Sequence, residues 1–253
     1  MKRNLTLAIL AKQKEPMLEA WLDHILDWDI DFKRIDIYAR TNNNTDLTRT
    51  ILADWLQTHG DKFNSWVLID KDFDKPIQKY GVHEWNAERF KILGEIRNDS
   101  IYYSQVMGND YLVVDVDNFL APDTVQRLWD WEVPVVGPLL HCVDPEQPAY
   151  SNYHSHIDPR GYYANHEDYY KIWKGHIRGL IEVPVIHCTY LIKFEWLNYM
   201  NYLDDSNDYE YVVFSRNLRG SDIPQYLDNT KLGGYLTCRE YVDKVTAAYK
   251  TML

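Results

Sequence analysis

The chain has 253 residues, of which 45% are hydrophobic, and this is enough to build one sizeable core. Its formal net charge of −11 repels phosphate backbones, which argues against a nucleic-acid partner. The sequence holds no apolar stretch long enough to span a membrane, and the apolar run after its basic start is too short for a signal peptide. We therefore expect a cytoplasmic protein with no membrane partner.

The first half of the chain alternates between two apolar patterns. Continuous apolar runs rich in strand-forming residues predict buried strands at residues 5–11, 34–39, 66–69 and 111–114. Apolar residues at helical spacing predict helices at residues 17–26, 51–56 and about 86–104. This alternation is typical of an α/β fold with a mostly parallel, Rossmann-like central sheet and helices on both faces.

The pattern changes beyond Pro134. Further strands are predicted at residues 135–139 and 182–192, and a terminal helix is predicted within residues 237–253. The intervening residues 141–179 are polar and rich in Tyr, His and Gly, and a loop of this length is usually a cover over a binding site. No linker interrupts the sequence, so we expect a single domain over residues 1–253.

Asp115 and Asp117 follow directly after the fourth predicted strand. Ligands of parallel sheets bind beyond the carboxyl ends of the strands, so these carboxylates are expected at the ligand edge. Hard oxygen ligands suit Mn²⁺ or Mg²⁺, and such an ion would let an acidic chain bind an anionic diphosphate. The alternative is a solvated turn in which Asp117 caps a helix that starts near Pro122.

The segment 110–120 resembles the amino-terminal GT-A-type glycosyltransferase domain of the procollagen galactosyltransferases. The likeness extends in the family's order over residues 41–46, 51–52, 55–56, Trp85 with Arg89 and Phe90, 136–138, 149–152, 161–163, 178–179 and 183–189. The resemblance implies a GT-A-type fold and an inverting, metal-dependent transfer of galactose from a UDP-sugar to hydroxylysine of a collagen-like polypeptide. It also implies that residues 1–120 form the nucleotide-binding half and residues 121–253 the acceptor-binding half.

The same resemblance assigns the donor site. It implies that Asp115 and Asp117 hold the metal and that Asp115 also lies near the uridine ribose. Residues of the nucleotide-sugar pocket would be Ala11, Thr41, Asn44 and Arg89, the last on the uridine or phosphate side. From the residues alone, Arg89 is equally consistent with a surface ion pair on a helix, and Thr41 and Asn44 with turn and cap residues.

An inverting displacement needs a base that accepts the proton of the acceptor hydroxyl. Family members carry an acidic pair just before an apolar run, which is here residues 211–214. In that register Glu210 matches one acid, Tyr209 stands in the place of the other, and Asp208 is a substitute if the loop shifts by one residue. The alternative is an ordinary solvated acidic loop.

His187 ends a predicted apolar strand and is expected to face the sugar pocket, although a buried histidine is more often simply hydrogen-bonded. GT-A enzymes commonly complete the metal shell with a late histidine, but no histidine follows His187 in this chain. Either His187 or water would complete the shell.

Two other functions remain open at this stage. The fold and nucleotide are shared by enzymes that transfer glucose from UDP-glucose to galactosylhydroxylysine. A catalytically silent collagen-binding module is the second alternative, favoured by the missing late histidine and opposed by Asp115 and Asp117. A dinucleotide-dependent oxidoreductase is set aside because no glycine-rich fingerprint follows the first strand. The sequence does not indicate an oligomeric state.

Overall fold

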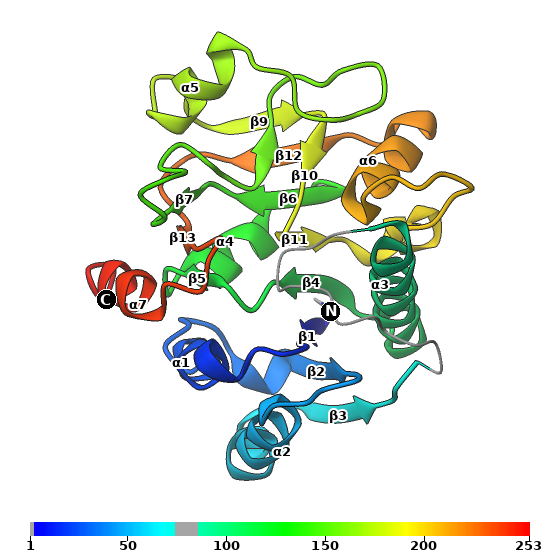
Figure 1. Cartoon of the computed structure of the whole chain (residues 1–253), viewed down its shortest axis with the longest axis vertical. Helices are drawn as coiled ribbons and strands as arrows, with labels where there is room; N and C mark the ends of the chain where they lie inside the picture. The colour runs from blue at the N-terminus through cyan, green and yellow to red at the C-terminus, as the bar shows by residue number, and fades with distance from the viewer. Residues whose placement is uncertain (1–2, 74–85) are drawn as a thin grey trace.

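The computed structural model describes residues 3–73 and 86–253, so that Trp85 lies outside the described residues. One eight-stranded sheet runs through the molecule and takes strands from both halves of the chain (Figure 1). In spatial order its strands are β3 (Ser65–Asp70), β2 (Ile35–Thr41), β1 (Leu5–Leu10), β4 (Asp110–Val114), β11 (Thr189–Ile192), β6 (Val135–Pro138), β12 (Gln225–Asp228) and β9 (Leu180–Val183).

The sheet is mostly parallel, as the alternating pattern predicted. The pairs β2–β3, β1–β2, β1–β4 and β6–β12 are parallel, whereas β11 runs antiparallel to both β4 and β6, and β9 runs antiparallel to β12. Thr189 at the start of β11 lies opposite Val114 at the end of β4. This register brings the residues just before β11 to the carboxyl edge of the parallel strands.

Two hydrophobic cores lie on opposite faces of the sheet, because side chains alternate along each strand. Leu5, Leu7 and Ile9 of β1 belong to one core and Ala8 belongs to the other. The first core is covered by α1 (Glu15–Ile25), α2 (Thr48–His59), α4 (Thr124–Asp130) and α7 (Val242–Lys250). The second core is covered by α3 (Ala87–Met107), α5 (Glu167–Trp173) and α6 (Glu210–Gly220).

Local sequence signals set the ends of the main helices. Pro16 stands in the first turn of α1, where its missing N–H costs nothing. The side chain of Asn86 accepts a hydrogen bond from the Arg89 N–H at the start of α3, and Gly108 ends this helix with a φ of 72°. Short 3₁₀ helices are η1 (Phe32–Arg34), η2 (Gly60–Lys62) and η3 (Phe194–Tyr199). Among the described residues, no helix combines the length and apolar character needed to cross a membrane.

The segment 141–179 is more ordered than the long polar cover loop that the composition predicted. It contains α5, β8 (Tyr153–His154) and the end of β7 (Leu140–Cys142). Two small sheets involve these strands, one of β5 (Asn118–Leu120), β13 (Gly234–Leu236) and β7, the other of β8 and β10 (Val185–Ile186). The prediction failed because the segment buries its own aromatic residues: Tyr153 and Tyr169 stack with ring centroids 4.8 Å apart.

The single strand predicted at residues 182–192 is also divided. Pro184 has no N–H to donate and separates β9 from β10, and Cys188 adopts a φ of 64° between β10 and β11. The kink at Cys188 places its carbonyl next to the end of β4.

Candidate active site

The carboxyl edge of the central sheet holds a tight turn that presents two carboxylates. The Asp115 N–H donates to the Cys188 carbonyl at 3.0 Å, and the Asn118 N–H donates to the Asp115 carbonyl at 2.9 Å. The Asp115 and Asp117 side chains are 27% and 29% exposed. The turn therefore holds both carboxylates at the ligand edge, each of them half-buried.

Arg97 joins Asp115 to Glu210 across the site. Its Nη2 lies 2.9 Å from Asp115 Oδ1 and 3.3 Å from Oδ2, and its Nε lies 3.5 Å from Glu210 Oε1. The Arg97 and Glu210 side chains are only 5% and 7% exposed. The structure thus brings together two acids that lie far apart in the sequence, and it does so through a residue that sequence reasoning did not assign to the site. The only signal was a charged residue beside the apolar stripe of α3.

Burial dominates the protonation behaviour of this group. Burial raises the pKa of Asp115, and Arg97 offsets this only in part. The pKa of Glu210 is likewise raised by burial, with Arg97 acting in the opposite direction. Burial acts to lower the pKa of the Arg97 guanidinium, but Asp115, Tyr190 and Glu210 outweigh it and hold this pKa well above its ordinary value. A buried carboxylate with a raised pKa is a stronger base than an exposed one, which suits it to accept a proton.

Asp208 has different partners from Glu210. Tyr162 donates a hydrogen bond to Asp208 Oδ1 at 2.8 Å, and Arg216 forms an ion pair with the other oxygen. Although burial acts to raise its pKa, the hydrogen bonds from Arg216 and Tyr162 hold the pKa of Asp208 below its usual range. A carboxylate held in this way is a weaker base, so the geometry favours Glu210 over Asp208.

Lys14 reaches Asp117 from the start of α1. Its Nζ lies 3.4 Å from Asp117 Oδ2 and 3.2 Å from Glu240 Oε1. The alternative in which Asp117 caps a helix is wrong, because β5 follows Asp117 and α4 begins only at Thr124. Lys14 and Glu240 are further members of the site that the sequence alone did not indicate.

The loops after β1 and β2 form a connected wall beside the carboxylates. The Ala11 N–H donates to the Arg40 carbonyl at 3.0 Å. Asn44 donates to the Thr41 hydroxyl and accepts a hydrogen bond from the Gln13 N–H at 3.0 Å. The turn role of Thr41 and Asn44 is thus present, and it leaves both residues at the edge where a ligand would bind.

Arg89 lies in the first turn of α3 and belongs to the same edge. Burial first and then the positive charge of Arg89 lower the pKa of Lys12, which follows Ala11. Two cations from different elements thus face the same side of the site, an arrangement that suits an anionic ligand.

His187 lies next to the Asp115 turn, just before the kink at Cys188. Burial lowers its pKa well below the ordinary value, so that the ring is neutral. Its Nδ1 lies 2.9 Å from Cys188 Sγ, and its ring packs 4.9 Å from that of Tyr211 and 5.6 Å from that of His154. The described contacts are those of a packed, neutral imidazole.

Strained backbone is concentrated around this edge. Among the described residues, five non-glycine residues have a positive φ, and four of them flank the site: Gln13, Asn43, Cys188 and Glu240. Such conformations cost free energy and persist where the surrounding structure enforces them, commonly at functional sites.

The charge of the cluster fits a divalent cation. Asp115, Asp117, Glu210 and Glu240 are four carboxylates, and within residues 3–73 and 86–253 they form ion pairs with two cations, Arg97 and Lys14. The cluster therefore has a formal charge of −2, which one dication would neutralise. Carboxylate oxygens are also the ligands that Mn²⁺ and Mg²⁺ prefer.

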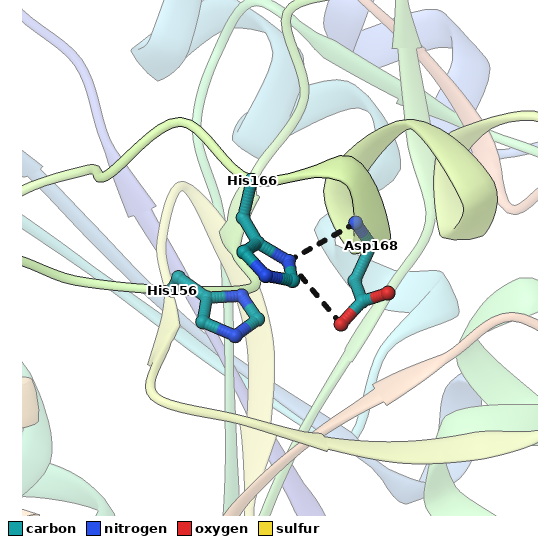
Figure 2. A group of neighbouring side chains, drawn as sticks. All are labelled: His156, His166 and Asp168. Atoms are coloured by element: carbon teal, nitrogen blue, oxygen red, sulfur yellow. Dashed lines mark hydrogen bonds and ion pairs between the residues drawn. The ribbon is translucent and has the colours of Figure 1, made fainter.

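A second group of metal-ligand types lies elsewhere, on the segment before α5 and in the first turn of α5 (Figure 2). The rings of His156 and His166 stack with centroids 3.6 Å apart, and His166 Nδ1 lies 3.2 Å from Asp168 Oδ2. His166 Nδ1 also accepts a hydrogen bond from the Asp168 N–H, which caps α5. Lys171 pairs with Asp168 at 3.5 Å. These hydrogen bonds and ion pairs are the ones expected at the amino-terminal end of a helix.

The sheet and its edge define the fold of a GT-A-type glycosyltransferase. S. aureus TarS 1-349 has a TM-score of 0.59 to this chain at 14% identity, covering 92% of this chain and 60% of its own. The mannosyltransferase PcManGT from Pyrobaculum calidifontis, solved with GDP-Man and Mn²⁺, has a TM-score of 0.54 at 13% identity, covering 94% and 57%. Identities this low establish the likeness of fold alone.

The chain belongs to glycosyltransferase family 25: the family model for the N-terminal domain matches residues 2–245. It is 28% identical to human procollagen galactosyltransferase 2 over 240 residues, which are 90% of this chain and 38% of the relative. It is 30% identical over 193 residues to the mouse inactive glycosyltransferase 25 family member 3, covering 75% and 32%. The chain thus spans well under half the length of these curated relatives.

Proposed function

We propose that this chain is a metal-dependent hexosyltransferase that uses a UDP-sugar donor and acts on hydroxylysine of a collagen-like polypeptide. Galactose is the first choice of sugar, in keeping with the relatives named procollagen galactosyltransferase. Transfer of glucose to galactosylhydroxylysine is the alternative. The observation that carries the proposal is the pair of half-buried carboxylates, Asp115 and Asp117, beside the buried acid Glu210 at the ligand edge of a GT-A sheet.

The donor side of the site lies mainly in residues 1–120. Asp115 and Asp117 would hold Mn²⁺ or Mg²⁺, which supplies positive charge for the leaving diphosphate. Ala11, Thr41 and Asn44 line the wall that would receive the nucleoside. Arg89 adds positive charge on the same side.

The acceptor side lies mainly in residues 121–253. The Glu210 carboxylate accepts the proton of the acceptor hydroxyl as that oxygen attacks the anomeric carbon, which inverts the configuration. Arg97 fixes the Glu210 carboxylate and separates its charge from that of Asp115. Asp208 is the second candidate for the base, and its pairing with Arg216 and Tyr162 makes it the weaker one.

A silent collagen-binding module is the second candidate function. The observation that favours it is the Lys14 ammonium on Asp117, in the region where a metal would bind. Some relatives are also named inactive members of family 25. In this case the chain would bind the polypeptide without transferring sugar.

A donor screen separates these functions. The full chain is incubated with Mn²⁺, a hydroxylysine peptide and UDP-galactose, UDP-glucose or UDP-N-acetylglucosamine, and the peptide is analysed by mass spectrometry. The same peptide with lysine in place of hydroxylysine is the acceptor control, and a galactosylhydroxylysine peptide tests the glucose alternative. We expect addition of one hexose from UDP-galactose to the hydroxylysine peptide only. Binding of the peptide with no transfer from any donor would leave the silent module as the function.

A further inference from the structure

The Lys14 ammonium lies between two carboxylates that come from distant parts of the chain. Its Nζ contacts Asp117 at 3.4 Å and Glu240 at 3.2 Å, and the three side chains are between 20% and 29% exposed. An ammonium in this position marks a place where the protein holds a cation. It also shows that the Glu240 carboxylate faces the same point as Asp117.

The backbone keeps these two carboxylates together. The Thr237 N–H donates to the Asp117 carbonyl at 3.1 Å, and the Tyr241 N–H donates to the Thr237 hydroxyl at 3.2 Å. Between these two bonds, Glu240 adopts a φ of 56°, in the left-handed region that a glutamate rarely occupies. The backbone of this segment therefore brings Glu240 to the Asp117 turn.

The backbone of Lys14 is anchored separately from its ammonium group. The Lys14 N–H donates to the Thr48 hydroxyl at 2.7 Å, which anchors the main chain at the start of α1. The four-carbon stem beyond it has several rotatable bonds, and the ammonium binds as a compact point charge. Rotation of this stem would expose the Asp117 and Glu240 oxygens to an ion from solvent.

We propose that Asp117 and Glu240 form one cation-binding pair, with Glu240 as a further ligand of the divalent cation, and that Lys14 occupies this position until the cation displaces it. The choice of a divalent cation rests on the proposed function. The Lys14 ammonium is the cation that this pair of carboxylates holds in the structure. Displacement is thus an exchange of one cation for another.

The test is a titration of the full chain with Mn²⁺ alone, in which the free ion is followed by electron paramagnetic resonance. Lys14→Met removes the ammonium and keeps most of the stem. Lys12→Met is the charge-matched control. Lys12 lies in the same loop, and the charged side chains that influence it are Arg89 and Asp72 rather than the two proposed ligands. We expect Lys14→Met to bind Mn²⁺ about tenfold more tightly than Lys12→Met. A positive charge this close to a carboxylate lowers the carboxylate's affinity for a proton by about tenfold or more, and we expect it to lower the affinity for Mn²⁺ in the same way.

The role of Glu240 is tested in the background without the competing ammonium. Lys14→Met with Glu240→Gln is expected to bind Mn²⁺ about tenfold more weakly than Lys14→Met alone, because a charged ligand is replaced by a neutral one. Circular dichroism checks the fold of each variant, and Lys14→Gln replaces Lys14→Met if the latter does not fold.

Three results would overturn the proposal. Equal affinities of the Lys14 and Lys12 variants would show that Lys14 does not compete, and an unchanged affinity on loss of Glu240 would show that it is not a ligand. Absence of Mn²⁺ binding in every variant would show that these carboxylates do not form a metal site. The titration contains no UDP-sugar or peptide, so a chain that binds Mn²⁺ in the expected order but transfers no hexose would refute the proposed function and leave this inference standing.

Discussion

Replacement of Arg97 by methionine should destabilise the protein strongly. The methionine fills part of the space of the arginine stem but leaves Glu210 buried without its cation and Asp115 without its hydrogen-bond donor. Removing one partner of a buried ion pair costs about 3–5 kcal/mol. Asp115 is 27% exposed, so water screens its charge and reduces the free-energy cost of leaving it without Arg97. We therefore expect the lower end, about 3 kcal/mol in the free energy of unfolding at pH 8.

The pH dependence gives this prediction a second signature. Without Arg97 the pKa values of Asp115 and Glu210, already raised by burial, rise further. A carboxyl group whose pKa is higher in the folded than in the unfolded protein adds stability at low pH, and this stability is lost as the pH rises through the folded pKa. The stability gap between wild type and variant should therefore be small near the ordinary carboxyl pKa values, 3.8 and 4.5, and should widen above them.

Urea unfolding followed by circular dichroism between pH 4.5 and 8 measures this gap. Arg49→Met is the control, because Arg49 pairs with Asp70 on the surface with 62% of its side chain exposed. Its loss should cost less than about 1 kcal/mol at every pH. An Arg97 variant as stable as the Arg49 variant, or a gap that does not change with pH, would refute the idea that Arg97 balances two buried acids.

Three further predictions concern single side chains. Asp117→Ala should abolish Mn²⁺-dependent transfer while the thermal unfolding midpoint stays near that of wild type, since a half-exposed side chain is lost and no cavity opens. Glu210→Gln should lose turnover and keep UDP-sugar affinity in calorimetry; turnover of the wild type should fall on the acid side as Glu210 becomes protonated, at a pH above its ordinary pKa of 4.5. Burial lowers the pKa of His24 to about 3, from 6.5, so the unfolded chain takes up the proton first and stability falls as the pH drops below 6.5. The loss from His24 should reach about 2 kcal/mol at pH 5, and urea unfolding of His24→Leu should lack this contribution.

The sequence predicted the parts of the site that depend on one strand and its direction. Val113 and Val114 mark the end of a buried strand, and in a parallel sheet that end must lie at the ligand edge, so Asp115 and Asp117 could be placed without coordinates. The same argument placed Ala11 and Thr41. The structure places these residues at the carboxyl ends of β1, β2 and β4, as predicted, because strand periodicity and sheet topology are local or nearly local properties; their roles in binding stay predictions.

The residues that the sequence missed act through long-range contacts. Arg97 meets Asp115 and Glu210 only after α3 and α6 pack on the same face of the sheet, where Figure 1 shows them side by side. Lys14 and Glu240 are separated by 226 positions and meet at a residue with unusual backbone geometry. None of these contacts joins residues at a spacing that a sequence motif could reveal.

Two cysteines also meet through a long-range contact. Cys142 and Cys238 lie with their sulfur atoms 3.8 Å apart, both as free thiols, although 96 positions separate them in the sequence. They meet because β7 and β13 pair in parallel, with Leu236 opposite Cys142. Spacing in the sequence therefore does not predict distance where strands from opposite ends of the chain pair.

The most direct test of donor binding at the Asp115 and Asp117 turn is isothermal titration of UDP into the full chain, with and without Mn²⁺. The site predicts tight binding of UDP only with the ion, and loss of that difference in Asp117→Ala. UDP binding of equal strength without Mn²⁺, or no UDP binding under either condition, would contradict the assignment of a metal-dependent donor site to this edge of the sheet.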